Sequence, residues 1–250
     1  AALMIHCSLG HADTWKGVCA ALEDEITATA FDIPGHGKSG DWDASGDIQQ
    51  QTTDIAADLI TDMDQDRVDV IGHSFGATVA LRLAVERPDM VRSLTLIEPV
   101  FFATVRGSTS QAVTDEKTRY GAFVDQLESG ERAKAAQGFC ALWGDGRSWE
   151  SYSPDQRDYI VDRIDLIEHA GVQLYDDAAG LMARLGEIDV PVLIINAAAS
   201  PPVIGEVCAK LAQSIANAQR QTIKGAGHMA PITHPKPVSA LISAFLKSSH

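Results

Sequence analysis

Short apolar runs alternate with amphipathic stretches along most of this chain. The apolar runs predict buried strands at 3–6, 27–32, 68–71, 93–98, 191–196 and 220–224. Between them, apolar residues recur at helical spacing over 14–23, 48–63, 75–86, 203–216 and 237–247. Strands that alternate with helices favour the α/β class, with a mostly parallel central sheet flanked by helices.

This alternation is interrupted once, between residues 99 and 187. The segment contains no convincing strand pattern, and helical spacing predicts helices at 110–127, 131–142, 155–169 and 175–185. Ten of the chain's fifteen aromatic residues fall within it. We therefore predict a helical cap with an apolar underside at 99–187, inserted into a core built from residues 1–98 and 188–250.

Composition narrows the functional classes. At 250 residues and 45% hydrophobic, the chain can bury a substantial core. A net charge of −14 argues against nucleic acid and anionic membranes as partners. The cysteines are scattered without metal-type spacing, which favours reduced thiols and a cytoplasmic location; they are Cys7, Cys19, Cys140 and Cys208.

The most informative motif is Gly72-His73-Ser74-Phe75-Gly76. It lies between a predicted strand and a predicted helix, where an abrupt turn needs neighbours without bulk. Such a turn exposes the Ser74 hydroxyl as a nucleophile. It also places the Phe75 backbone N–H at a helix N-terminus, where it can stabilise an oxyanion.

A serine hydroxyl needs a base within hydrogen-bond reach. His228 is the best candidate, because it follows the last predicted strand in a glycine-bearing loop. That loop lies at the carboxyl end of the sheet, where the sites of open α/β folds gather. We predict that His228 is the base.

The third group should be a carboxylate that orients the imidazole. The loop after the strand at 191–196 contains Ser200 but no carboxylate, whereas Glu98 closes the strand at 93–98 at the correct end of the sheet. Glu98 is therefore the predicted acid, with Glu206 as a distant alternative. A purely anchoring role for Glu98 at the entrance to the cap stays open.

Further site residues follow from this arrangement. We expect the second oxyanion donor to be the backbone N–H of Ser8, in the loop after the first strand. The aromatic cap and the histidine loop predict substrate contacts from Phe101, Trp143 and Met229.

Four motifs together resemble the α/β-hydrolase superfamily, in its cap-bearing, serine-esterase-like branch. They are the oxyanion segment at 6–15, the Asp-x-Pro-Gly-x-Gly-x-Ser turn at 32–39, the nucleophile elbow at 72–76 and the histidine loop at 225–228. The resemblance covers essentially the whole chain and implies the α/β-hydrolase fold with a helical cap.

The chain departs from this family pattern in three ways. Cys7 replaces a usual glycine, and Ser200 stands where most members carry the acid. One group of haloalkane dehalogenases instead has a glutamate after the preceding strand, which Glu98 matches. The family commonly has two further strands before the oxyanion segment; without them, an exposed sheet edge would favour a homodimer.

The resemblance implies a serine hydrolase of carboxylic esters, lactones or thioesters with small to medium apolar acyl groups. Members that hydrolyse epoxides or haloalkanes carry an elbow aspartate, so Ser74 argues against both activities. We expect a small-molecule substrate and neither a metal nor an organic cofactor. One alternative is a carbon–carbon bond hydrolase that holds a dicarboxylate through Arg106, Arg119 or Arg132, and the other is a ligand-binding protein with weakened catalysis.

Overall fold

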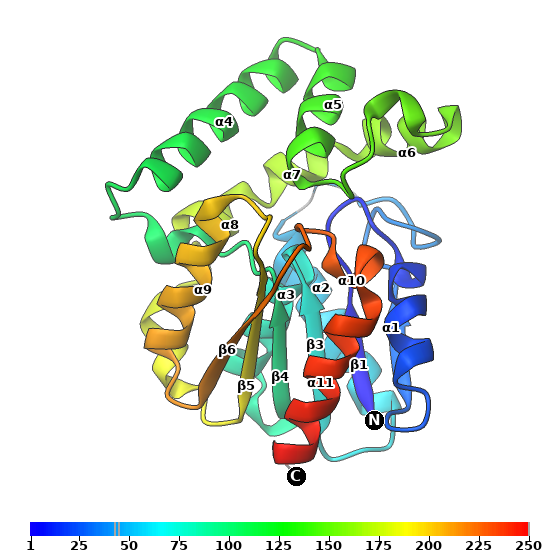
Figure 1. The fold of residues 1–250 in the computed structure, drawn as a ribbon, viewed down its shortest axis with the longest axis vertical. Coiled ribbons are helices and arrows are strands. Elements are labelled where there is room, and N and C mark those ends of the chain that lie inside the picture. Colours follow the sequence, from blue (N-terminus) through cyan, green and yellow to red (C-terminus); the bar gives the residue numbers. More distant parts are fainter. Residues whose placement is uncertain (43, 45, 250) are drawn as a thin grey trace.

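The central sheet is parallel throughout. The computed structural model describes residues 1–42, 44 and 46–249. Within them, six strands are hydrogen-bonded in the order β2-β1-β3-β4-β5-β6 (Figure 1). The strands are β1 (Ala2–Ile5), β2 (Ala28–Phe31), β3 (Val68–His73), β4 (Val91–Ile97), β5 (Val192–Ala197) and β6 (Ala218–Ile223). This arrangement confirms the predicted fold class.

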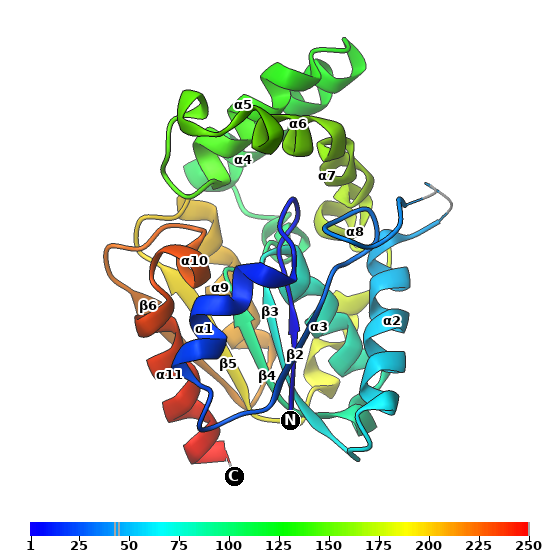
Figure 2. The same cartoon turned by 90° about the vertical axis from the view of Figure 1, so that its right-hand side faces the viewer.

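Helices cover both faces of the sheet (Figure 2). One face is covered by α1 (Lys16–Ala21), which continues the 3₁₀ turn η1 (Ala12–Trp15), and by α11 (Pro235–Ser249). The other is covered by α2 (Ile48–Asp62), α3 (Phe75–Glu86) and α9 (Pro202–Ser214). Two short elements, η2 (Pro88–Met90) and α10 (Ala230–Thr233), complete the core.

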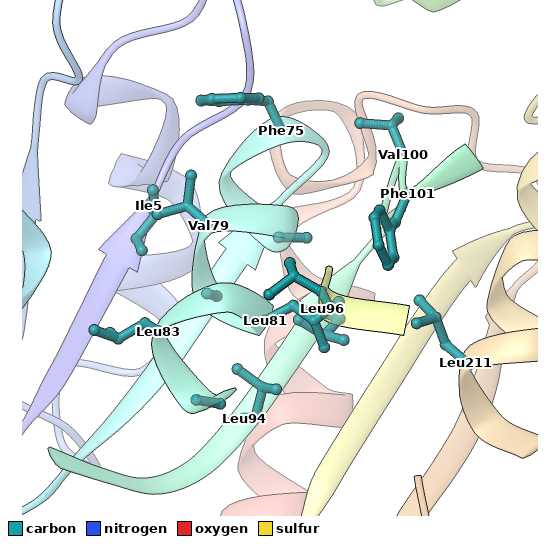
Figure 3. Close-up of a cluster of buried hydrophobic side chains, with 14 of the residues drawn as sticks. Ile5, Phe75, Val79, Leu81, Leu83, Leu94, Leu96, Val100, Phe101 and Leu211 are labelled. Carbon is teal, nitrogen blue, oxygen red and sulfur yellow. The ribbon is translucent and has the colours of Figure 1, made fainter. Parts of the chain in front are cut away.

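The strands are apolar on both faces because both are covered. In β3, Val68 and Val70 pack into the cluster on the α3 side, whereas Ile71 packs into the cluster on the α11 side. Figure 3 shows the first cluster, in which Leu81 of α3 lies close to Leu96 of β4. Each such buried side chain contributes about 1.5–3 kcal/mol relative to exposure, and the packing fixes α3 behind the serine turn.

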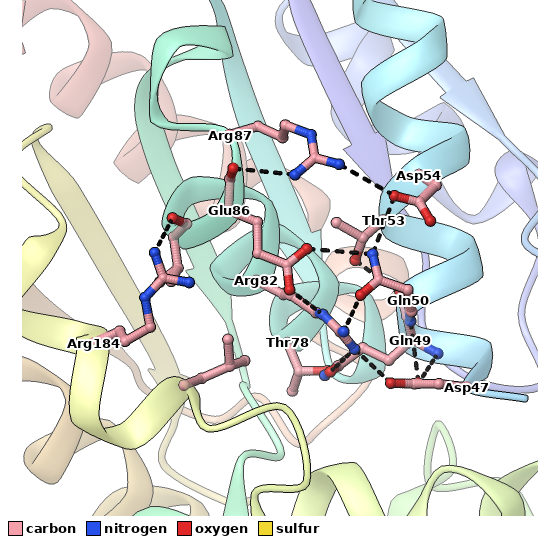
Figure 4. A network of polar contacts seen from close by, with 12 residues as sticks. Asp47, Gln49, Gln50, Thr53, Asp54, Thr78, Arg82, Glu86, Arg87 and Arg184 are labelled. Carbon is pink, nitrogen blue, oxygen red and sulfur yellow. Dashed lines mark hydrogen bonds and ion pairs between the residues drawn. The ribbon is translucent and has the colours of Figure 1, made fainter.

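A buried arginine ties α2 to α3 (Figure 4). The Arg82 guanidinium donates to Asp47 at 2.6 Å and to Glu86 at 2.8 Å. Burial alone would lower the pKa of Arg82, but the hydrogen bonds to these two carboxylates more than offset it and raise that pKa. Asp47 also caps α2 by accepting from the backbone N–H groups of Gln49 and Gln50.

Residues 99–187 lie above the carboxyl ends of the strands (Figures 1 and 2). Their described elements are all helical: η3 (Phe102–Val105), α4 (Gln111–Glu128), α5 (Arg132–Trp143), η4 (Trp149–Ser151), α6 (Pro154–Arg163), α7 (Asp165–His169), α8 (Gly171–Asp176) and η5 (Leu181–Glu187). Across the described parts of the chain, no helix combines the length and apolar character needed to cross a membrane.

Two predicted cap helices were wrong in extent. The helix expected at 155–169 is divided at Ile164 into α6 and α7, and Arg132 donates to the carbonyls of Val161 and Asp162 near that break. The helix expected at 175–185 is interrupted at Asp177, which has a φ of 57°. The Asp177 carboxylate accepts from the backbone N–H of Leu181 and so stabilises a turn instead.

Candidate active site

Ser74 occupies a strained turn between β3 and α3. Its φ is 56° and its ψ is −117°, a backbone conformation that residues other than glycine rarely adopt. A Cβ on Gly72 would overlap the carbonyl of Gly76, and a Cβ on Gly76 would overlap the carbonyl of Ile5. The two glycines are therefore required for the close approach of β1, β3 and α3 that holds the serine in place.

The structure brings together the three residues predicted as nucleophile, base and orienting acid. His228 Nε2 lies 2.9 Å from Ser74 Oγ, and His228 Nδ1 lies 3.1 Å from Glu98 Oε2. All three are buried, with Glu98 fully so. Since the carboxylate accepts from Nδ1–H, Nε2 is left as the acceptor for the Ser74 hydroxyl.

Glu98 is held by groups at the end of β5 and in the loop after it. The backbone N–H of Ala197 donates to Glu98 Oε1 at 2.6 Å, and the Ser200 hydroxyl donates to Oε2. Glu98 itself has a φ of 52°. Ser200, which occupies the position where most family members carry the acid, therefore hydrogen-bonds to Glu98 at the end of the neighbouring strand β4.

The loop after β1 closes over the serine. Leu9 has a φ of 60°, and the N–H of Gly10 donates to the carbonyl of Cys7 at 3.1 Å, which forms a tight turn around Ser8. Ser8 lies beside Ser74 in the site. Phe75 is the first residue of α3, so its N–H has no acceptor within the helix.

His6 anchors this loop from below. Its Nε2 accepts from the N–H of Ile33 at 3.0 Å, and its Nδ1 donates to the carbonyl of Cys7 at 2.7 Å. Burial lowers the pKa of His6 to about 3, so the ring is neutral at physiological pH. Burial also raises the pKa of the Cys7 thiol to about 12, which makes Cys7 a packing residue rather than a nucleophile.

With this geometry established, one comparison decides the family. A model of the alpha/beta hydrolase family matches residues 2–241. The chain belongs to the α/β-hydrolase family. The structure of MenH from S. aureus has the same fold, with a TM-score of 0.74 at 18% identity over 99% of this chain and 93% of MenH.

Three relatives of this α/β hydrolase have names that indicate a reaction. Lipase LipV of Mycobacterium tuberculosis is 35% identical over a match that covers 57% of this chain and 51% of the lipase. The chain therefore spans about half the length of that relative. A pimeloyl-[acyl-carrier protein] methyl ester esterase of Methylococcus capsulatus is 26% identical over 99% and 94%. An (E)-2-((N-methylformamido)methylene)succinate hydrolase of Acinetobacter baylyi is 22% identical over 99% and 90%.

Two cavities in this α/β hydrolase meet at Ser74. The apolar cavity, of about 240 Å³, is lined by the side chains of Phe102, Tyr120, Phe123, Leu142 and Leu174 among others. The second cavity, of about 460 Å³, also has a mostly apolar surface, but one part of its wall is polar, and we call it the polar cavity for that part: Asp145, Arg147, Tyr152, Asp155 and Gln156. Five residues line both: Ser8, Ser74, Phe139, Trp143 and His228.

The predicted substrate contacts have different outcomes. Trp143 lines both cavities, with its ring edge-on to His228 at 4.8 Å between centroids. Met229 lines the polar cavity. Phe101 is instead fully buried in the core against β4 and α9, as Figure 3 shows, and its neighbour Phe102 lines the apolar cavity.

One supporting residue, His73, was not predicted. Its Nε2 donates to the backbone carbonyl of His228 at 2.8 Å and so positions the histidine loop. Burial, together with the nearby His228, lowers the pKa of His73 to about 3, which keeps the ring neutral. The available signal was its place within the elbow motif, directly before Ser74.

The three cap arginines are placed differently. Arg132 pairs with Asp165, and Arg106 donates to the carbonyl of Asp176 at 3.3 Å. Arg119 lines the apolar cavity, where it pairs with the buried Glu116 at 3.4 Å. Each of the three contacts an oxygen of the chain, but Arg119 Nε is buried without a hydrogen-bond partner among the described residues, so Arg119 keeps an unused donor at the apolar cavity.

Proposed function

We propose that this protein is a serine hydrolase of carboxylic esters that acts through an acyl-enzyme. The supporting observation is the continuous set of hydrogen bonds from Ser74 through His228 to Glu98. Ser74, at one end of this set, lines an apolar cavity. The relatives named as a lipase and as a methyl ester esterase also favour this chemistry.

In the proposed reaction, Ser74 Oγ attacks the ester carbonyl carbon while His228 Nε2 takes the hydroxyl proton. The Ser8 and Phe75 N–H groups stabilise the resulting oxyanion, and Glu98 stabilises the imidazolium. The carbon–oxygen bond to the alcohol then breaks, and His228 returns the proton to the departing oxygen. Water repeats the sequence on the acyl-enzyme, which releases the acid and regenerates Ser74. Lactones and thioesters would follow the same path.

The alternatives have less support. A carbon–carbon bond hydrolase acting on a dicarboxylate needs cationic groups for both carboxylates, whereas of Arg106, Arg119 and Arg132 only Arg119 lines a cavity at Ser74. A binding protein without catalysis would not need the serine and histidine in hydrogen-bond contact with each other, as they are at 2.9 Å.

The test is a burst experiment with p-nitrophenyl acetate and butyrate, combined with mass spectrometry after treatment with a fluorophosphonate. We expect turnover and a single adduct on Ser74, with both lost in His228→Ala. A folded protein that gives neither turnover nor an adduct would refute the proposed function and favour the binding role.

A further inference from the structure

The two cavities provide separate places for the two halves of an ester. Phe139 and Trp143, both on α5, line both cavities and so form the partition between them at Ser74. An ester carbonyl at Ser74 would therefore extend its acyl part into one cavity and its alcohol part into the other.

The apolar cavity suits the acyl chain. Its wall includes a stack of rings in which Tyr175 lies 4.6 Å from Phe102 and 4.2 Å from Tyr120. The charged groups in this wall, Glu116 and Arg119, pair with each other, and Glu116 also accepts from the Tyr175 hydroxyl at 2.8 Å. An acyl chain in this cavity would therefore contact aromatic rings and charged groups that are already paired.

The polar cavity contains a preorganised set of donors and acceptors. The Arg147 guanidinium donates to Asp145 Oδ2 at 2.7 Å and lies 4.3 Å from the centre of the Tyr152 ring. The Tyr152 hydroxyl donates to Asp145 Oδ1 at 3.1 Å. These contacts hold Arg147 in place, yet 46% of its side chain is exposed, so part of the guanidinium remains available to a ligand.

The charges in this cavity select among alcohols. Asp145 and Asp155 both line it beside Arg147, so the guanidinium leaves no excess positive charge for an anionic alcohol. An uncharged hydroxyl group can both accept from Arg147 and donate to a neighbouring carboxylate. A polyol carries several such groups and would satisfy the donors and acceptors together.

The surroundings of His228 also favour the polar cavity for the departing alcohol. His228 must protonate the departing alcohol, and Met229 and Ile232, which follow it in the chain, line the polar cavity but not the apolar one. His228 itself lines both cavities, so it is the rest of the histidine loop that favours the polar cavity for the departing alcohol.

Building on the proposed ester hydrolysis, we propose that the polar cavity recognises an uncharged polyol, so that the substrate class is monoesters of glycerol-like alcohols with an apolar acyl group. Arg147, held by Asp145 and Tyr152, is the specificity-determining residue for the alcohol. The apolar cavity sets the acyl length.

The test compares glyceryl monobutyrate with methyl butyrate, which share an acyl group and differ in the alcohol. We expect the wild-type enzyme to have the higher kcat/KM for the glyceryl ester. Arg147→Gln should lower the glyceryl-to-methyl ratio of kcat/KM about ten-fold or more, because hydrogen bonds from a charged donor are lost. Deacylation of the common butyryl-enzyme should be the same for both esters.

Two variants serve as controls. Arg157→Gln removes the same charge from α6 at a position that lines neither cavity, and the ratio should not change. Gly138 lines the apolar cavity, and an added Cβ there meets no heavy atom within 4 Å. Gly138→Leu should therefore fold, lower activity on hexanoyl esters about ten-fold or more relative to acetyl esters, and keep the alcohol preference.

The outcomes separate the two proposals. Absence of turnover with every ester, and of a Ser74 adduct, would overturn ester hydrolysis itself. Turnover that favours the methyl ester, or a ratio unchanged by Arg147→Gln, would overturn the polyol assignment alone. A Gly138→Leu variant that changes the alcohol preference instead of the acyl preference would also overturn it, because the cavities would then have the opposite roles.

Discussion

Replacing Glu98 by glutamine tests the site most directly, because the structure dictates how the amide would sit. The Ala197 N–H donates to Glu98 Oε1 at 2.6 Å, so the amide oxygen of the new side chain would take that position. The amide NH₂ would then face His228 Nδ1, which at present donates to Oε2. Two donors cannot face each other, so Nδ1 must become the acceptor and the ring proton must move to Nε2.

An imidazole protonated at Nε2 cannot accept the proton of Ser74. Loss of the correct tautomer costs about 10⁴-fold in kcat, which corresponds to about 5.4 kcal/mol of transition-state stabilisation. The measurement is kcat/KM with p-nitrophenyl butyrate, with circular dichroism and thermal unfolding to establish that the variant is folded.

Glu206→Gln is the matched control, because Glu206 was the alternative acid. Its carboxylate contacts the Ser108 hydroxyl at 3.4 Å, so activity should stay within about two-fold, as expected for a change that leaves the relay intact. A Glu98→Gln enzyme that retains more than about a tenth of the wild-type kcat/KM would refute the acid assignment.

Three further outcomes are expected. Ser200→Ala removes a donor to the Glu98 carboxylate and should lower kcat about ten-fold, whereas Ser200→Asp should also lower it by placing a second carboxylate there; an active Ser200→Asp enzyme would contradict this. Arg82→Met should lower the free energy of unfolding in urea by about 1–3 kcal/mol, because it leaves the partly buried carboxylates of Asp47 and Glu86 without their partner; a loss below about 0.5 kcal/mol would mean that the network adds little. The pKa values of His6 and His73 are about 3 in the folded protein, against an ordinary value of 6.5. The unfolded chain therefore binds protons first, and each ring should remove about 1.4 kcal/mol of stability per pH unit below about pH 6.5; urea midpoints that stay constant from about pH 6.5 to about pH 5 would refute this.

The strands and the serine turn could be predicted from the sequence because their signals are local. Apolar runs mark β3 and β4, and two glycines at fixed spacing mark the turn at Ser74. Glu98 could be inferred by elimination, since a carboxylate at the end of a strand is readable from the chain alone. These predictions needed no knowledge of which side chains touch.

Contacts between distant residues could not be read in this way. Ser200 and Glu98 are 102 positions apart, and their contact exists because β4 and β5 are neighbours in the sheet. Phe101 and Phe102 are adjacent, yet one is in the core and the other lines the apolar cavity. The direction of each ring depends on the path of the chain after Pro99, which apolar patterning does not encode.

The order of the reactive groups along the chain has a consequence for biosynthesis. Ser74 and Glu98 belong to one strand–helix–strand unit, β3-α3-β4, whereas His228 follows β6, near the C-terminal end of the described chain. Since N-terminal parts emerge from the ribosome first, the proposed nucleophile and acid can be in place before the proposed base has been synthesised. A nascent chain that ends before β6 holds its serine next to neither the proposed base nor the loop that carries it, so the proposed hydrolysis requires that β6 and the loop after it have been synthesised.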